Sequence, residues 1–100
     1  MSNIVSNILS WNEFQSAALA RGSDEVIVRE WAPLEVVPTH SHPFAADALV
    51  VAGEMWLTQN SAVKHLTPGD TFQLAADEPH DERYGPHGAV YWVARTTPPK

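Results

Sequence analysis

Two histidines one residue apart could do chemistry that few other residues in the sequence could do. His40 and His42 lie between two prolines in the segment PTHSHPF, residues 38–44. Alternate side chains of a β-strand face the same side, and two steps along the strand separate them by roughly 6.5 Å. Both imidazoles could therefore bind one metal ion at about 2.1 Å. In a chain with five histidines the pair also arises by chance, so an exposed polar pair is the alternative interpretation.

The remaining ligands of such an ion would have to be nitrogen or oxygen. The chain contains no cysteine, which excludes disulfides, thiolate ligands and a cysteine nucleophile. Four residues are candidates for a third and fourth ligand: Asp47, His65, His80 and His87. His80 is favoured, because the tight segment Asp77–His80 could return the chain to the first pair. No residue outside this set can be assigned a catalytic role from the sequence.

The composition limits the classes of partner. A chain of 100 residues with 44% hydrophobic residues is typical of one compact domain. The net charge is −6, and the six lysines and arginines are scattered, so nucleic acid is not an expected partner. No apolar run approaches about 20 residues, and the first residues lack a basic signal region. We therefore expect a cytoplasmic protein that has no membrane partner.

The N-terminal segment, residues 1–24, is expected to contain one short helix. Ser10 and Glu13 have the spacing of a capping box. Apolar residues on one face then continue the helix through about Ala20, with Gly22 as its C-terminal cap. The residues of that face are Trp11, Phe14 and Ala18.

From residue 25 the apolar pattern changes to a period of two, which predicts short β-strands. A type II turn is expected at Thr67–Asp70, a hairpin at Gln59–Ser61 and a loop at Gly85–Gly88. Several short strands with regular turns favour an all-β sandwich or small barrel. The predicted strands cover residues 25–31, 34–37, 46–52, 55–58, 62–66, 71–75 and 89–94.

Residues 27–95 resemble the cupin superfamily, whose two motifs run Gly-x5-His-x-His-x3–4-Glu-x6-Gly and Gly-x5-Pro-x-Gly-x2-His-x3-Asn. His40, His42 and Gly53 match the first motif, and Gly69 and His80 match the second. The resemblance implies a cupin-type β-barrel or jelly roll over residues 25–96, preceded by the short helix.

The sequence departs from these motifs at several positions. Counting forward from His42 puts Asp47 at the place of the motif glutamate, whereas counting back from Gly53 puts Ala46 there. A bulge would bring Asp47 inward, and a regular strand would face it outward, because a one-residue slip exchanges the two faces. Four further motif positions carry other residues: Leu34, Ala75, Asp77 and Tyr84.

By this resemblance, a divalent ion (Fe, Mn, Ni, Cu or Zn) would be bound in the barrel mouth. Its ligands would be His40, His42, His80 and Asp47. The implied function is a metal-binding cupin with a small-molecule ligand or substrate, and an enzyme of the dioxygenase, isomerase or decarboxylase type would be one such protein. A non-catalytic binding or sensing module is the alternative, and a metal-free structural barrel is a third.

Three further expectations concern the surroundings of the site. Phe44 and Tyr84 are the aromatic residues closest in sequence to the proposed ligands, so we expect them at the pocket. Arg83 could bind an anionic substrate or form a surface ion pair. A homodimer through unpaired edge strands is expected.

Overall fold

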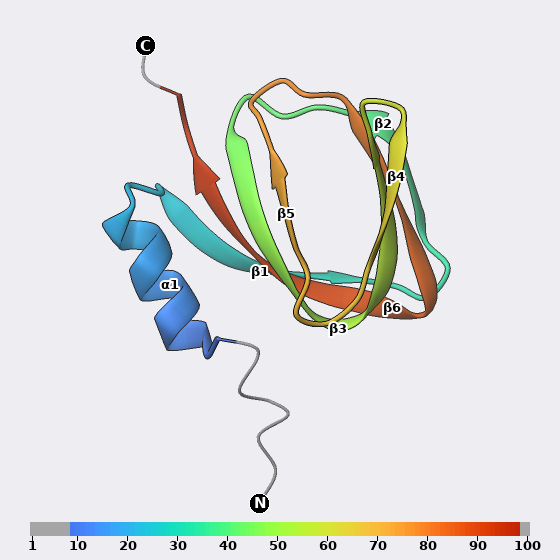
Figure 1. Cartoon of the computed structure of the whole chain (residues 1–100), viewed down its shortest axis with the longest axis horizontal. Helices are drawn as coiled ribbons and strands as arrows, with labels where there is room; N and C mark the ends of the chain where they lie inside the picture. Colours follow the sequence, from blue (N-terminus) through green and yellow to red (C-terminus); the bar gives the residue numbers. More distant parts are fainter. Residues whose placement is uncertain (1–8, 99–100) are drawn as a thin grey trace, which may run out of the picture.

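One helix precedes six strands in the computed structural model, which describes residues 9–98 (Figure 1). The helix packs beside one end of a barrel that the strands form (Figure 1). The elements are α1 (Trp11–Ala20), β1 (Glu25–Trp31), β2 (Val36–His40), β3 (Ala45–Gln59), β4 (Ala62–Leu66), β5 (Thr71–Leu74) and β6 (His80–Thr96). The predicted all-β barrel with a short N-terminal helix is confirmed. In residues 9–98, no helix has the length and apolarity needed to cross a membrane.

Local signals in the sequence set the limits of α1. The Ser10 side chain accepts a hydrogen bond from the Glu13 backbone, and the Glu13 carboxylate accepts one from the Ser10 backbone, as the capping box predicts. Gly22 follows the helix at φ 98°, a left-handed conformation that ends it. Phe14 and Ala18 are buried against the outer face of the barrel, on a small core with Leu49 and Ala94.

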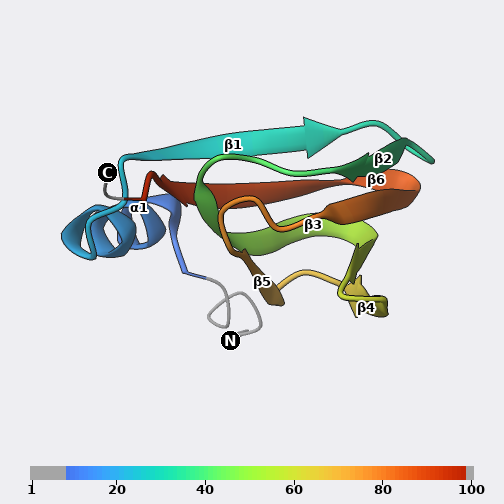
Figure 2. The same ribbon diagram turned by 90° about the horizontal axis from the view of Figure 1, so that it is seen from above.

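A long antiparallel ribbon of β3 and β6 organises the barrel. The two strands pair from Ala45 with Thr96 to Gln59 with His80. The C-terminal half of β6 also pairs with β1, and its N-terminal half with β2. On the other side of the ribbon, β5 pairs with the start of β3 and β4 with its end. Figure 2 shows β1 and β2 on one side of the ribbon and β4 and β5 on the other.

The ribbon bends where two glycines meet. Its register shifts between Val50 and Met55, and Gly53 and Gly88 there have φ values of 75° and 69°. A Cβ on Gly53 would lie 2.1 Å from the carbonyl oxygen of Gly88, so only glycine allows this approach. The bend turns both halves of the ribbon toward one interior core, which is built around Met55, Leu57 and Phe72.

The structure corrects two of the strand boundaries that the sequence predicts. Residues 85–88, expected to form a loop, lie within β6, and the two runs expected as separate strands at 46–52 and 55–58 form the single strand β3. In both cases the glycines mark the bend of a continuous ribbon rather than its end. The turn at Thr67–Asp70 and the hairpin at Gln59–Ser61 are confirmed, with backbone hydrogen bonding from Asp70 to Thr67 in the turn.

Candidate metal centre

Three histidines from two parts of the chain meet at one end of the barrel interior. His40 ends β2, His42 lies in the following loop, and His80 begins β6. One ring nitrogen of each lies within 4.8 Å of a ring nitrogen of the other two. His40 is the register partner of His80, so the pairing of β2 with β6 brings the two cupin-like motifs together. A further backbone hydrogen bond, from Asp77 N to His42 O at 2.6 Å, connects the loop after β2 to the loop before β6.

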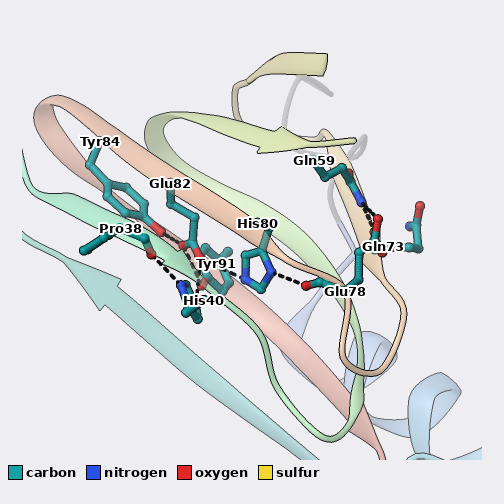
Figure 3. A network of polar contacts seen from close by, with 9 residues as sticks. All are labelled: Pro38, His40, Gln59, Gln73, Glu78, His80, Glu82, Tyr84 and Tyr91. Atoms are coloured by element: carbon teal, nitrogen blue, oxygen red, sulfur yellow. Dashed lines mark hydrogen bonds and ion pairs between the residues drawn. The ribbon is translucent and has the colours of Figure 1, made fainter. Parts of the chain in front are cut away.

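Backbone carbonyls fix the orientation of two of these rings. Nδ1 of His40 lies 2.8 Å from the carbonyl oxygen of Pro38, and Nδ1 of His80 lies 3.0 Å from that of Glu78 (Figure 3). A carbonyl can only accept, so each Nδ1 carries the proton and donates. Nε2 is therefore the nitrogen of each ring that can offer a lone pair to an ion. This is the arrangement in which metal-binding histidines are usually held.

His42 is held by an aromatic neighbour. Its ring stacks on Phe44 with centroids 4.9 Å apart and an angle of 8° between the planes. Partial burial lowers the pKa of His42, and the neighbouring His40, His80 and Arg95 lower it further. His42 is therefore neutral at pH 7, as a metal ligand must be.

The buried face of His80 has an unsatisfied nitrogen. Its side chain is 1% exposed, and among the described residues Nε2 has no hydrogen-bond partner. A buried polar atom without a partner costs about 1–3 kcal/mol, so such an atom needs an explanation. A divalent ion at the centre of the three histidines would bind this lone pair. The residues present thus fit the ion that the cupin resemblance implies.

Asp47 is not among the residues brought together. Its carboxylate lies on the outside of the barrel, 3.3 Å from the guanidinium of Arg21 and 3.1 Å from the side-chain amide of Gln73. Strand alternation explains this position, since the buried neighbours Ala46 and Ala48 face the interior. No bulge lies between residues 45 and 50 to reverse the two faces. Ala46, which has no ligand atom, lines the cavity beside the histidines.

A different carboxylate faces the histidines. Glu82 follows His80 by two residues on β6, and its Oε2 lies 3.5 Å from Nε2 of His80 and 3.8 Å from Nε2 of His40 (Figure 3). Glu82 is not among the candidate ligands that the sequence predicts. The signal that could have found it is the period of two, which puts residues 80 and 82 on one face of a strand.

Two tyrosines bind the other oxygen of Glu82. The hydroxyls of Tyr84 and Tyr91 both donate to Oε1, the second at 3.4 Å. Burial raises the pKa of both phenols, to about 12 for Tyr91, with the Glu82 charge adding to the effect. Both are therefore neutral donors at pH 7. Tyr84 also stacks on Trp31, with ring centroids 5.2 Å apart.

The other candidates lie away from this cluster. His65 is on the outer face of β4, where Nε2 lies 2.7 Å from the Glu54 carboxylate and the ring stacks on Trp56. His87 is exposed near the bend of β6. Arg83 lies over the outer face of Trp56, 4.8 Å from the ring centre, so it does not point into the barrel.

The histidines and Glu82 line a cavity of about 70 Å³. Its walls include the apolar side chains of Phe72, Leu74 and Val93. Two guanidinium groups also line it, those of Arg29 on β1 and Arg95 on β6. Arg95 pairs with Glu25 at 3.1 Å, whereas within the described part of the chain Arg29 forms no ion pair and lies over the ring of Trp31. Phe44 lines the cavity as expected, whereas Tyr84 does not line it and instead donates a hydrogen bond to Glu82, which does.

Comparisons with known proteins identify the family. Residues 24–96 match the family described as the AraC-like ligand-binding domain. No curated protein matched the chain.

Several solved structures share the fold. A chain from the crystal structures of the DMSP lyases RdDddP and RnDddQII has a TM-score of 0.66 and 25% identity, over 71% of this chain and 37% of that chain. A double-stranded β-helix protein from Klebsiella pneumoniae has a TM-score of 0.60 and 27% identity, covering 71% and 64% of the two chains. The Cnp3 cupin domain from Schizosaccharomyces pombe has a TM-score of 0.69 and 13% identity, covering 77% and 58%.

The chain therefore spans little more than one third of the lyase chain that it matches. The family match covers most of the sequence, and the structural relatives share its double-stranded β-helix. The chain belongs to the AraC-like ligand-binding domain family and has the cupin fold.

Proposed function

We propose that this protein is a metal-binding cupin that binds a small molecule in the barrel cavity. The observation that carries the proposal is the convergence of His40, His42 and His80, with one buried nitrogen of His80 that has no hydrogen-bond partner within residues 9–98. The carbonyls of Pro38 and Glu78 orient two of the rings before any ion binds. Such preorganisation reduces the conformational entropy that ligand residues lose on binding.

The three histidines would hold the ion. Imidazole nitrogens suit Fe, Ni, Cu and Zn, and an added carboxylate extends the range to Mn. A bound divalent ion would supply Lewis-acid polarisation of a carbonyl or activation of water or dioxygen. The chain itself contributes an apolar wall that limits access of water, and the neutral state of His42, which burial favours.

The small molecule is a compact anion. Although the chain carries a net charge of −6, the cavity is lined by two arginines and a single carboxylate. A planar guanidinium binds a carboxylate through paired hydrogen bonds, and Arg29, which lies over the Trp31 ring and forms no ion pair with residues 9–98, could bind an anion in this way. An anion in the cavity would also be attracted by the charge of the ion.

Such a site could either catalyse a reaction of the bound molecule or bind it without turnover. One structural relative comes from the crystal structures of DMSP lyases. This relative favours the catalytic candidate, an enzyme of the lyase, dioxygenase, isomerase or decarboxylase type. The family's ligand-binding description favours the second candidate, a binding or sensing module without turnover. Formation of a new product from a bound anion would establish the first, and saturable binding with no product would establish the second.

The assembly and location are also proposals. We propose a cytoplasmic homodimer that acts without nucleic acid or membrane partners. The strand β1 lies at one end of the strand order, and its Val28 side chain is 47% exposed. An edge strand with an exposed apolar residue can pair with a second copy. Light scattering after size exclusion tests this, with a mass of about twice 11.0 kDa expected.

Elemental analysis tests the metal function directly. Untagged protein is purified without chelator, and its metal content is compared with that of His42→Ala and of the control His65→Ala. We expect close to one ion per chain in the wild type and in His65→Ala, and a loss of most of it in His42→Ala. A wild type that contains no metal and binds none of the five candidate ions on addition would refute the proposal.

A further inference from the structure

We propose that Glu82 supplies the carboxylate ligand of this centre, in place of the glutamate that the first cupin motif normally provides. The assignment rests on the proposed metal function. At the motif position the interior residue is Ala46, which has no donor atom, and the neighbouring Asp47 lies outside the barrel with Arg21. The carboxylate has thus moved from β3 to β6.

The distances agree with shared coordination. Two ligand atoms that each lie about 2.1 Å from one ion are separated by about 3.0 Å at right angles and about 3.4 Å in a tetrahedron. Oε2 of Glu82 lies 3.5 Å from Nε2 of His80 and 3.8 Å from Nε2 of His40. Shifts of a few tenths of an ångström would bring these three atoms to separations at which all of them could bind one ion. These separations are also too long for strong hydrogen bonds between the same atoms.

The two tyrosines determine which oxygen faces the ion. Tyr84 and Tyr91 both donate to Oε1, which leaves Oε2 directed at the histidines. Figure 3 shows Tyr84 on the side of Glu82 away from His80. Hydrogen bonds of this kind hold ligating carboxylates in one orientation.

Burial of the Glu82 carboxylate has to be compensated by its surroundings. The Glu82 side chain is 5% exposed, and a buried carboxylate needs a compensating positive charge as well as hydrogen bonds. Neutral phenols supply only the hydrogen bonds. A bound divalent ion would supply the charge, whereas the arrangement without metal has only the histidine rings beside Glu82.

Cobalt binding separates these two arrangements. Apo protein is titrated with Co²⁺ against a competing chelator, and the visible spectrum is recorded for the wild type, Glu82→Gln and the control Asp47→Asn. We expect Glu82→Gln to weaken Co²⁺ binding by about 10–100-fold and to change the spectrum. Asp47→Asn should keep both the affinity, within about twofold, and the wild-type spectrum.

The outcomes distinguish this inference from the proposed function. If the wild type binds Co²⁺ and a folded Glu82→Gln binds it equally well with the same spectrum, the assignment is wrong while the histidine centre stands. If the wild type binds no Co²⁺, the metal function itself fails and the assignment falls with it.

A second measurement covers the case in which Glu82→Gln does not fold. The infrared difference between Zn²⁺-loaded and apo wild type should contain a shifted carboxylate stretch, because coordination changes the two C–O bonds unequally. The same band should persist in Asp47→Asn. A difference spectrum without any carboxylate band would overturn the assignment.

Discussion

The carboxylate of Glu82 and the imidazole of His80 lie two residues apart on β6 and face each other across 3.5 Å. Both side chains are almost fully buried, so neither can turn to solvent. One nitrogen and one carboxylate beside the cavity therefore come from the same short piece of strand, while His40 and His42 come from β2 and the loop after it. This relationship explains how a barrel whose motif glutamate is replaced can still present three nitrogens and one carboxylate to an ion.

The arginines give the cavity a charge preference that can be measured. Arg29→Gln in metal-loaded protein should weaken acetate binding about tenfold and leave acetamide binding unchanged, because the charge-assisted hydrogen bond is lost only for the anion. Chemical shifts of the tryptophan indole protons during titration report both affinities. Arg83→Gln is the matched control, since Arg83 lies on the outer face over Trp56. Equal losses for acetate and acetamide would contradict the proposed role.

The bend of the ribbon should tolerate no side chain at Gly53. Gly53→Ala should destabilise the protein by about 2–5 kcal/mol, since the added Cβ would collide with the Gly88 backbone as well as hold a positive φ. The control is Gly22→Ala, which also has a positive φ but nothing within 4 Å of the new Cβ. It should cost only about 1 kcal/mol. Urea unfolding compares the two, and equal losses would show that the contact is not restrictive.

Leu34 offers a stabilising change. It occupies the position of the first motif glycine, has φ 61° and is 70% exposed. Leu34→Gly should raise the free energy of unfolding by about 0.5–1 kcal/mol, because relief of the left-handed strain outweighs the added freedom of the unfolded chain. Leu34→Ala removes the same exposed side chain but retains the strain, so thermal unfolding should show no gain. A gain in both variants would locate the effect in the side chain instead.

Acid should weaken the contact between the residues just before β1 and those just after β6. Asp24 accepts a hydrogen bond from the Thr97 backbone, which lowers its pKa below the ordinary 3.8. A carboxylate with a lowered folded pKa contributes stability above its unfolded pKa and loses it as the pH falls through the folded value.

Comparison with Asp24→Asn isolates this contribution. The difference in unfolding free energy between the wild type and the variant should be constant from pH 7 to about pH 4 and shrink below that. The other carboxylates titrate in both proteins, so their contributions cancel in the difference in unfolding free energy. A difference that stays the same down to pH 2 would show that the charge of Asp24 has no part in it.

Features set by neighbouring residues were predictable from the sequence. The capping box at Ser10 and Glu13 and the turn at Thr67–Asp70 depend on contacts three residues apart, so their signals are complete within a short segment. Convergence of His40, His42 and His80 was predictable only through the cupin resemblance, because it needs the pairing of β2 with β6.

The carboxylate that faces the histidines could not be identified from the sequence, because its position depends on contacts between distant segments. One residue of register decides whether Ala46 or Asp47 faces inward, and both counts fit part of the motif. Glu82 was missed because Gly85–Gly88 resembled a loop, so the strand was not extended back to His80. Its burial also depends on Tyr91, nine residues further along β6.

Anomalous X-ray scattering from a crystal soaked in Co²⁺ or Zn²⁺ tests the central claim most directly. The account predicts one strong peak per chain at the absorption edge of the metal, about 2.1 Å from a ring nitrogen of each of His40, His42 and His80. A crystal with no peak there, or with its main peak at His65 and Glu54 on the outer face, would contradict the account.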